Sequence, residues 1–292
     1  MTRLYLEVFV LNPKQKKKLL KRARQQHTVK PSGYIATMER YNTLFADFPT
    51  IKILINNVLQ ADRLLKQGLL PQTLPQLLLP DNTQDVIFKQ LNETFPAGDP
   101  AGDKRWNQLS DALPDLDKKL RSFRDYLEDT YGMWAYISAP VAKDLADFIN
   151  GRPTLEVMAG NGYVSKGLQD NGQTVITTDS KDWTKENETG KHPVTKVERL
   201  TASEAFTKYH DQVDVIVMVW SPDGLTIDWD LLQQIRAADK DYDFIVIGEK
   251  DGATDSKVFW QNAKLLETPA VKALNKHFNQ FDLIHDHVYL VK

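Results

Sequence analysis

Hydrophobic and polar positions follow two different patterns along this 292-residue chain. From about residue 153 onward, short runs rich in β-branched residues alternate with helix-like stretches, which is typical of βαβ units. The second half therefore predicts an α/β fold of the Rossmann-like type, with a mostly parallel sheet. The expected strands are 154–158, 174–178, 194–197, 213–219 and 244–247, with helices over 164–170, 203–210 and 230–238 and one or two edge strands in 281–292.

The first half, up to about residue 150, has few strand-like runs and predicts a mainly helical region. We expect one strand at 5–10, a basic helix from Lys14 to Arg24, and helices over 51–70, 115–130 and 140–150. The segment 96–103 is rich in Pro, Gly and Asp and is typical of a linker. The predicted regions are a helical region 1–103 that ends in this linker, a helical lead-in 104–150, and a Rossmann-like domain 151–292.

Composition narrows the classes of function. The chain has no cysteine, which excludes disulfides, thiolate zinc sites and cysteine nucleophiles. A net charge of -2 gives no overall bias toward nucleic acid or a membrane surface. No apolar run reaches the roughly 18–20 residues that span a bilayer, and the N-terminus lacks the pattern of a secretory signal. We expect a cytoplasmic protein without a membrane partner. His285 and His287 share one strand face, but no third ligand is evident, so no metal is expected.

The turn after the first expected strand carries the main functional prediction. The text from Leu155 to Tyr163 contains Gly160 and Gly162, which let the backbone turn tightly and approach a ligand. Asp179 follows Gly160 by nineteen positions, directly after the second expected strand. A carboxylate there can accept hydrogen bonds from both hydroxyls of an adenosine ribose. The combination predicts a site for a nucleotide-type cofactor.

Two residues distinguish between cofactors. A dinucleotide fingerprint requires Gly or Ala at the position that Ser165 occupies. The carboxylate of Glu156 lies in the strand that approaches the turn, where it would repel a pyrophosphate and attract a sulfonium ligand with an amino group. The electrostatics therefore favour S-adenosylmethionine (SAM) over NAD.

This segment resembles the class I SAM-dependent methyltransferases, which carry Glu/Asp-x-Gly-x-Gly-x-Gly at this turn. The present text is E-V-M-A-G-N-G, with Met158 in place of the first glycine. The resemblance implies a SAM cofactor, with adenine contacts just after the third strand. The residues that it implies for cofactor binding are Glu156, Met158, Gly160, Asn161, Gly162, Tyr163, Asp179, Ser180, Thr201, Ala202 and Trp220.

Residues from about 125 onward are similar to a group of poorly characterised bacterial and fungal methyltransferase-like proteins. The similarity lies in the segments 131–138, 220–222, 248–249 and 254–256. Tyr131, Trp134 and Tyr136 are candidates to line the methionine end of the cofactor, although an aromatic cluster is more often part of the core. Catalytic candidates are Ser221, as a hydrogen-bond acceptor for the substrate, and Asp223 and Glu249, as bases.

The expected activity is methyl transfer from SAM to an unidentified acceptor, which is a small molecule or a macromolecule. A catalytically silent SAM-binding scaffold remains an alternative, motivated by Met158 and the Trp220-Ser221-Pro222 loop. An NAD-dependent oxidoreductase is a weaker alternative, because no Tyr-x-x-x-Lys pair is evident. The basic helix from Lys14 to Arg24 admits nucleic acid as a partner, but charge runs are usually solvated faces, so this partner is not favoured.

Overall fold

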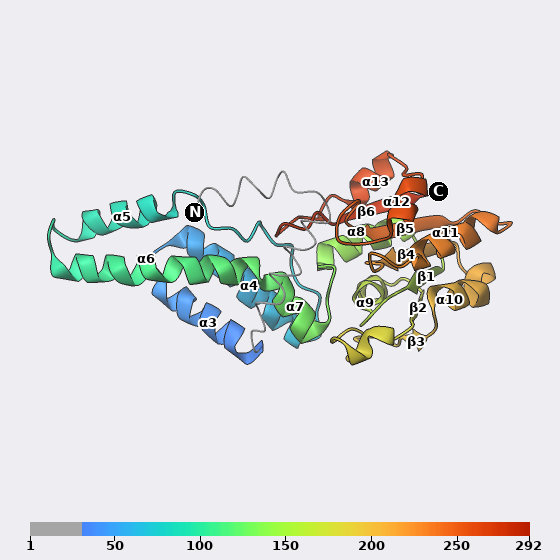
Figure 1. The fold of residues 1–292 in the computed structure, drawn as a ribbon, viewed down its shortest axis with the longest axis horizontal. Helices are drawn as coiled ribbons and strands as arrows, with labels where there is room; N and C mark the ends of the chain where they lie inside the picture. The colour runs from blue at the N-terminus through green and yellow to red at the C-terminus, as the bar shows by residue number, and fades with distance from the viewer. Residues whose placement is uncertain (1–30) are drawn as a thin grey trace.

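The structure is a computed structural model that describes residues 31–292. The strand expected at 5–10 and the basic helix expected from Lys14 to Arg24 lie outside the described residues. Figure 1 shows an elongated molecule, with a helical region at one end and a sheet covered by helices at the other. None of the helices in the described part of the chain is long and apolar enough to span a membrane.

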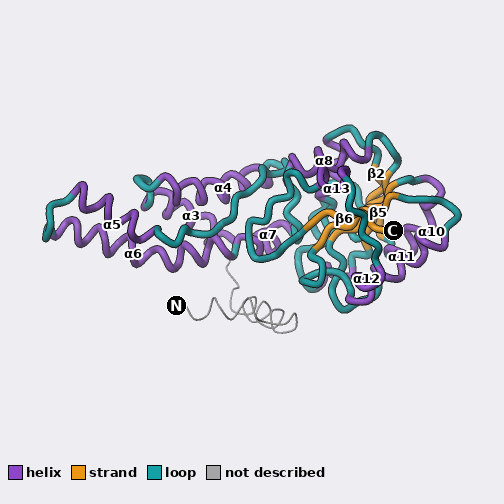
Figure 2. The backbone as a smooth tube through the Cα atoms, turned by 90° about the horizontal axis from the view of Figure 1, so that it is seen from above, coloured by secondary structure: helices purple, strands orange, loops and turns teal. Residues whose placement is uncertain are grey.

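The helical region is built from five helices within residues 31–131. They are α3 (Pro31–Leu44), α4 (Pro49–Lys66), α5 (Thr83–Thr94), α6 (Pro100–Arg121) and α7 (Phe123–Tyr131). In Figures 1 and 2, α5 and α6 run side by side and project away from the sheet. The predicted helix 51–70 corresponds to α4, while the predicted helix 115–130 is divided at Ser122 between α6 and α7.

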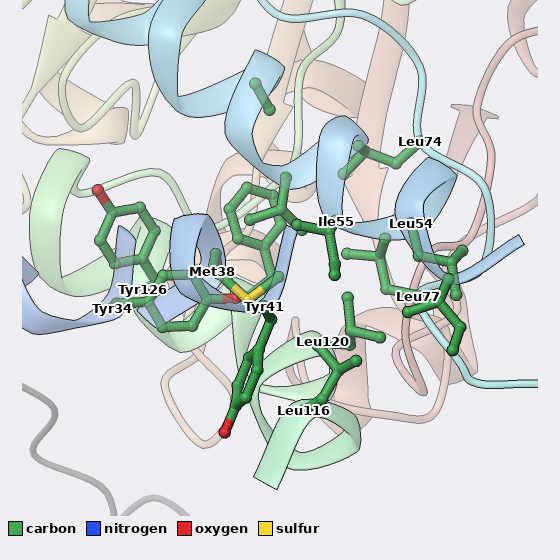
Figure 3. Packing of buried hydrophobic residues seen from close by; sticks show 14 of the residues in the cluster. Tyr34, Met38, Tyr41, Leu54, Ile55, Leu74, Leu77, Leu116, Leu120 and Tyr126 are labelled. Atoms are coloured by element: carbon green, nitrogen blue, oxygen red, sulfur yellow. The ribbon is translucent and has the colours of Figure 1, made fainter. Parts of the chain in front are cut away.

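A continuous apolar core holds these helices together. Met38, Ile55 and Leu120, from α3, α4 and α6, are all buried in it, as Figure 3 shows. Each such side chain contributes about 1.5–3 kcal/mol through burial. The rings of Tyr34 and Tyr126 stack in the same cluster, with centroids 4.5 Å apart. The helical region therefore has an extensive apolar core, to which Phe281 from the C-terminal part of the chain also contributes.

The segment 96–103 differs from the linker that its composition predicts. Asp99 is the N-cap of α6 and accepts a hydrogen bond from the backbone N–H of Ala101 at 2.8 Å, and Pro100 is the first helical residue. Across the resulting turn, the rings of Phe88 and Trp106 pack edge to face with centroids 5.5 Å apart. Pro96 and Gly98 therefore lie in the turn of a helical hairpin, while Pro100 and Gly102 belong to α6, which continues without interruption through residue 104.

The sheet has six strands within the described residues, in the order β3-β2-β1-β4-β5-β6. All neighbours are parallel except the edge strand β6, which is antiparallel to β5. The strands are β1 (Thr154–Val157), β2 (Val175–Asp179), β3 (Glu198–Arg199), β4 (Val215–Val219), β5 (Asp243–Gly248) and β6 (His287–Val291). The expected run 213–219 forms the central strand β4, buried on both faces.

The third strand lies later in the chain than the run 194–197 predicts. The backbone N–H of Val194 donates to the carbonyl of Asn161 at 2.8 Å, so this run is attached to the turn after β1. The chain joins the sheet only at Glu198, which pairs with Thr178 of β2. A tertiary contact therefore overrides the β-propensity of this strand-like run.

Helices cover both faces of the sheet. The helices α8 (Ala139–Ile149), α9 (Tyr163–Asp170) and α13 (Pro269–Leu274) pack on one face, and α10 (Ala202–Tyr209), α11 (Ile227–Ala237) and α12 (Lys257–Asn262) on the other. Two short 3₁₀ helices, η1 (Asp182–Lys185) and η2 (His210–Gln212), lie in the connections. The predicted fold class, a Rossmann-like α/β sheet behind a mainly helical region, is confirmed for residues 31–292.

Candidate functional site

A cavity of about 430 Å³ lies at the carboxyl ends of β1, β2 and β4. Strand order reverses here, because β1 leads outward to β2 on one side and pairs with β4 on the other. Ligands of open α/β sheets bind at such switch points. The turns after these strands and the segment 132–137, which leaves the helical region, form the cavity wall.

The turn after β1 has a left-handed backbone at three alternating positions. The φ angles are 56° at Met158, 54° at Gly160 and 81° at Gly162. Met158 therefore has a backbone conformation that glycine adopts readily, although a side chain there costs about 1–2 kcal/mol. Met158 and Gly160 both line the cavity. A Cβ at Gly162 would lie 2.8 Å from Cγ2 of Thr195, so this glycine is also required for close packing.

Glu156 lines the cavity but is almost completely buried. Its carboxylate accepts hydrogen bonds from the backbone N–H of Ser165, at 2.8 Å, and from the Ser165 hydroxyl. Burial, together with the nearby charge of Asp179, raises the pKa of Glu156 to about 7, and the Ser165 hydrogen bonds oppose that rise. Ser165, the residue that breaks the dinucleotide pattern, is thus the residue that holds this carboxylate.

Asp179 ends β2 and also lines the cavity. Its two carboxylate oxygens accept hydrogen bonds from the backbone N–H groups of Gly160, at 2.8 Å, and Lys181, at 2.6 Å. Each oxygen retains a second lone pair. Asp179 therefore fixes the turn after β1 and can still accept a hydrogen bond from a ligand.

The start of α10 forms another part of the wall. Thr201 caps this helix in a reciprocal arrangement with Glu204, and Thr201 and Ala202 line the cavity together with Ser180. The structure adds residues that the sequence analysis missed, notably Trp183 of η1 and Ile227 of α11. The sequence feature that could have indicated Trp183 is the place of this aromatic residue four positions after Asp179.

Two tryptophans form the aromatic side of the cavity. The rings of Trp134 and Trp220 lie 5.9 Å apart between centroids and are tilted by 47°. Trp220 has a left-handed backbone, with φ of 51°. Tyr131 and Tyr136 do not belong to the cavity wall within the described residues. The Tyr131 hydroxyl donates to Asp62, and the Tyr136 hydroxyl donates to the Gln72 carbonyl. The structure thus places one of the three predicted aromatic residues at the cavity.

Asn161 has a structural position beside the turn. Its side-chain amide donates to the carbonyls of Tyr131, at 2.8 Å, and Glu188, at 3.1 Å, and its oxygen accepts from the His192 N–H at 3.2 Å. Within residues 31–292, neither Asn161 nor Gly162 belongs to the cavity wall, whereas Tyr163 does. Asn161 therefore connects the turn after β1 to the end of α7.

Of the three catalytic candidates, Ser221 lies at the cavity in the described part of the chain, and Asp223 and Glu249 do not. The Ser221 side chain is buried, and its hydroxyl has no hydrogen-bond partner among residues 31–292. The Glu249 carboxylate instead accepts from the backbone N–H groups of Ala253, at 2.8 Å, and His285, at 3.0 Å. These bonds hold the loop after β5, which is why Glu249 does not point into the site.

Asp255 was missed because Thr-Asp-Ser before a helix is an ordinary capping pattern. Its backbone N–H donates to the Ser221 carbonyl at 2.8 Å. One of its carboxyl oxygens has no partner within the described residues, and burial raises its pKa to about 8, with Asp228 and Asp286 adding to the rise. The residue whose backbone binds the Ser221 carbonyl therefore carries a protonatable carboxyl.

The fold and cavity define an α/β protein with a candidate ligand site at the switch point of a Rossmann-like sheet. No family model and no curated protein matches this chain. Among solved structures, it is similar to the CurJ carbon methyltransferase, with a TM-score of 0.34 and 12% identity over 92% of this chain and 98% of that chain. It is also similar to the mitomycin 7-O-methyltransferase MmcR, with a TM-score of 0.28 and 14% identity over 74% of each chain.

Proposed function

We propose that the protein is a SAM-dependent methyltransferase. The charge of the cavity carries this proposal: among the described residues of its wall are Glu156, Asp179 and Asp182, and no Lys, Arg or His. Such a wall favours a ligand with a sulfonium and an amino group and disfavours the pyrophosphate of NAD. The groups on the wall therefore fit SAM better than a dinucleotide.

The chain's own residues would hold the cofactor as follows. Asp179 accepts from the ribose hydroxyls, and Ser180, Thr201 and Ala202 surround the adenine. The Glu156 carboxylate attracts the amino group, and the left-handed turn at Met158 and Gly160 brings the backbone close to the ligand. When bound, SAM supplies a methyl group activated for displacement.

The chain contributes orientation and exclusion of water at the acceptor. Trp134 and Trp220 cover one side of the cavity. Ser221 lies on the same wall, but its unpaired hydroxyl is buried, so its side chain has to turn toward the cavity to bind an N–H or O–H group of the acceptor. Holding an acceptor in line with the methyl carbon supplies a large part of the rate enhancement. The acidic wall favours an uncharged or cationic acceptor over a phosphate-bearing one.

A catalytically silent SAM-binding protein is the second candidate. It is favoured by one observation, that within residues 31–292 the cavity wall includes neither Asp223 nor Glu249, the two predicted bases. Binding with methyl transfer to a panel of amines and phenols supports an enzyme, and binding without transfer to any of them supports the silent protein.

Calorimetric titration with SAM, S-adenosylhomocysteine and NAD tests the proposal. We expect heat and a thermal shift with the first two and neither with NAD. Asp179→Ala should abolish the response, whereas Asp170→Ala, which changes an exposed carboxylate paired with Lys166 on α9, should not. No response to either SAM or S-adenosylhomocysteine at millimolar concentration, with a clear response to NAD, would contradict the proposal.

A further inference from the structure

Arg124 of α7 is a buried cation that joins the helical region to the chain around the cavity. Its guanidinium binds Asp282 in a bidentate manner, with N–O distances of 2.5 and 3.1 Å, and Asp286 at 3.1 Å. Burial lowers the pKa of Arg124, but the Asp286 and Asp282 carboxylates outweigh that effect and raise it. Arg124 is therefore a permanent positive charge that is paired with the carboxylates of Asp282 and Asp286.

The first cavity residue that Arg124 reaches is Trp220. The indole N–H of Trp220 donates to Asp286 at 2.9 Å, and the guanidinium carbon of Arg124 lies 5.2 Å from the centre of the Trp220 ring. Asp286 thus bridges the arginine and the tryptophan. The left-handed backbone of Trp220 is unfavourable for so large a residue and persists only where several contacts hold it.

The second cavity residue that Arg124 contacts is Trp134, on the other side of the aromatic wall. Arg124 donates to the Trp134 carbonyl at 2.5 Å, and the Trp134 indole N–H donates to the Thr189 hydroxyl at 2.7 Å. Both tryptophans line the cavity, and so does Thr189. One guanidinium therefore contacts both sides of the aromatic wall, either directly or through Asp286.

Stability alone gives a weak reason for this arrangement. A buried ion pair contributes little net stability, because desolvation of the charges offsets most of their attraction, and apolar residues of similar volume do as well. What apolar residues cannot supply is directed hydrogen bonding to the Trp134 carbonyl and, through Asp286, to the Trp220 indole. The directional contacts converge on two residues of the cavity wall.

We propose that Arg124 is a positioning residue of the methyl-transfer site, which holds Trp134 and Trp220 at their fixed separation so that the cavity is preformed. The helical region thereby contributes to ligand binding although none of the residues in α3 to α7 lines the cavity. This role rests on the proposed function for the identity of the ligand.

Arg124→Lys removes the bidentate contact and keeps the charge. The matched control is Arg152→Lys, because Arg152 also pairs with an aspartate, Asp243, at 2.5 Å and lies over an aromatic ring, Phe148, at 5.2 Å, but away from the cavity. We measure S-adenosylhomocysteine affinity by calorimetry, and the Trp220 indole N–H resonance by NMR, assigned with Trp220→Phe.

For Arg124→Lys we expect about tenfold weaker binding and a displaced Trp220 resonance in a protein that remains folded by circular dichroism. Arg152→Lys should change neither. Because Arg124 acts partly through Trp220, the double variant Arg124→Lys/Trp220→Phe should lose less binding free energy than the sum of the two single losses.

Three results would overturn the inference: Arg124→Lys binding within about twofold of the wild type, an unmoved indole resonance, or additive losses in the double variant. If Arg124→Lys does not fold, Asp286→Ala takes its place, since it removes the acceptor of the Trp220 indole N–H, and the same outcomes decide. Failure of the wild type itself to bind S-adenosylhomocysteine is a distinct result, which overturns the proposed function and the role of Arg124 with it.

Discussion

Met158 occupies a left-handed backbone position that glycine adopts at little cost. We expect Met158→Gly to be more stable than Met158→Ala by about 1 kcal/mol, since both remove the same side chain but only alanine keeps the strained Cβ. Urea unfolding measures the difference. Equal stability, or a more stable alanine variant, would show that this turn does not have the left-handed geometry described above.

Glu156 should make cofactor binding depend on pH. With a pKa raised to about 7, the free protein holds this carboxyl protonated in acid, and a cationic ligand favours the ionised form. SAM affinity should therefore rise as pH increases from 6 to 8, by up to about tenfold per pH unit below the pKa. Calorimetry at several pH values measures the slope.

Glu156→Gln should remove that pH dependence, because the amide does not titrate in this range. Glu186→Gln, which changes an exposed carboxylate in the loop after β2, serves as the control and should leave the slope intact. A slope that persists in Glu156→Gln would assign the titration to another group.

At the scale of elements, the contact between α4 and α7 supports the turn after β1. Asp62 of α4 is buried and accepts hydrogen bonds from the hydroxyls of Tyr126, at 2.6 Å, and Tyr131, at 2.7 Å. The Tyr131 carbonyl in turn accepts from Asn161 and from the Tyr163 hydroxyl. The helical region thus reaches the candidate site through the end of α7.

Removal of one of these hydroxyls should destabilise the protein. We expect Tyr131→Phe to lower the free energy of unfolding by about 1–3 kcal/mol, because it leaves the buried Asp62 with one donor fewer. Tyr41→Phe also breaks a tyrosine–aspartate bond, 2.5 Å to Asp115, but Asp115 is exposed and water replaces the hydroxyl. Its loss should be smaller in a chemical denaturation experiment, and a larger loss for Tyr41→Phe would argue against this account.

Local patterns determined which elements could be predicted from the sequence. The strand-like runs predicted β1, β2, β4 and β5 to within two residues. The turn at Gly160 and the strand end at Asp179 were also predicted from local sequence, and both line the cavity. One prediction failed where a distant contact decides, because β3 begins late when Val194 binds Asn161. Segment 96–103 instead contains local helix-start signals, Asp99 as N-cap and Pro100 as first helical residue, which its linker-like composition obscured.

The same distinction applies to the candidate site. Trp183 reaches the cavity through a 3₁₀ turn that has no periodic signal, and the contacts of Arg124 join residues 158 positions apart. Glu249 shows the converse: its place at the end of β5 was correctly predicted, but the loop that it holds consumes its carboxylate. Position along a strand can thus be read from sequence more readily than the direction of a side chain.

At the scale of the whole molecule, buried carboxyl groups should make the protein more stable in mild acid. Burial raises the pKa of Asp255 to about 8, of Glu156 to about 7 and of Asp286 to about 6. In the unfolded chain these groups ionise near pH 4, so between pH 4 and each folded-state pKa the folded protein holds protons that the unfolded chain has released. The free energy of unfolding should therefore fall as pH rises through this range.

We expect a melting temperature several degrees higher at pH 5.5 than at pH 8.5, measured by calorimetry. Asp255→Asn should raise the value at pH 8.5 and reduce the difference, because it removes the group with the highest pKa of the three. Asp170→Asn, an exposed change on α9, should have no such effect. A protein that becomes more stable toward pH 8.5 would reverse the sign of the predicted linkage.

The pairing of Arg124 with Asp282 has a consequence for the growing chain. Arg124 is synthesised before Asp282, and the two residues are 158 positions apart. At about 5–20 residues per second, the delay is roughly 8–30 s. During that interval Arg124 has no ion pair with Asp282 or Asp286, although its guanidinium is buried in the folded protein. Until Asp282 and Asp286 have been synthesised, water must therefore solvate this cation, and the start of α7 stays exposed in the nascent chain.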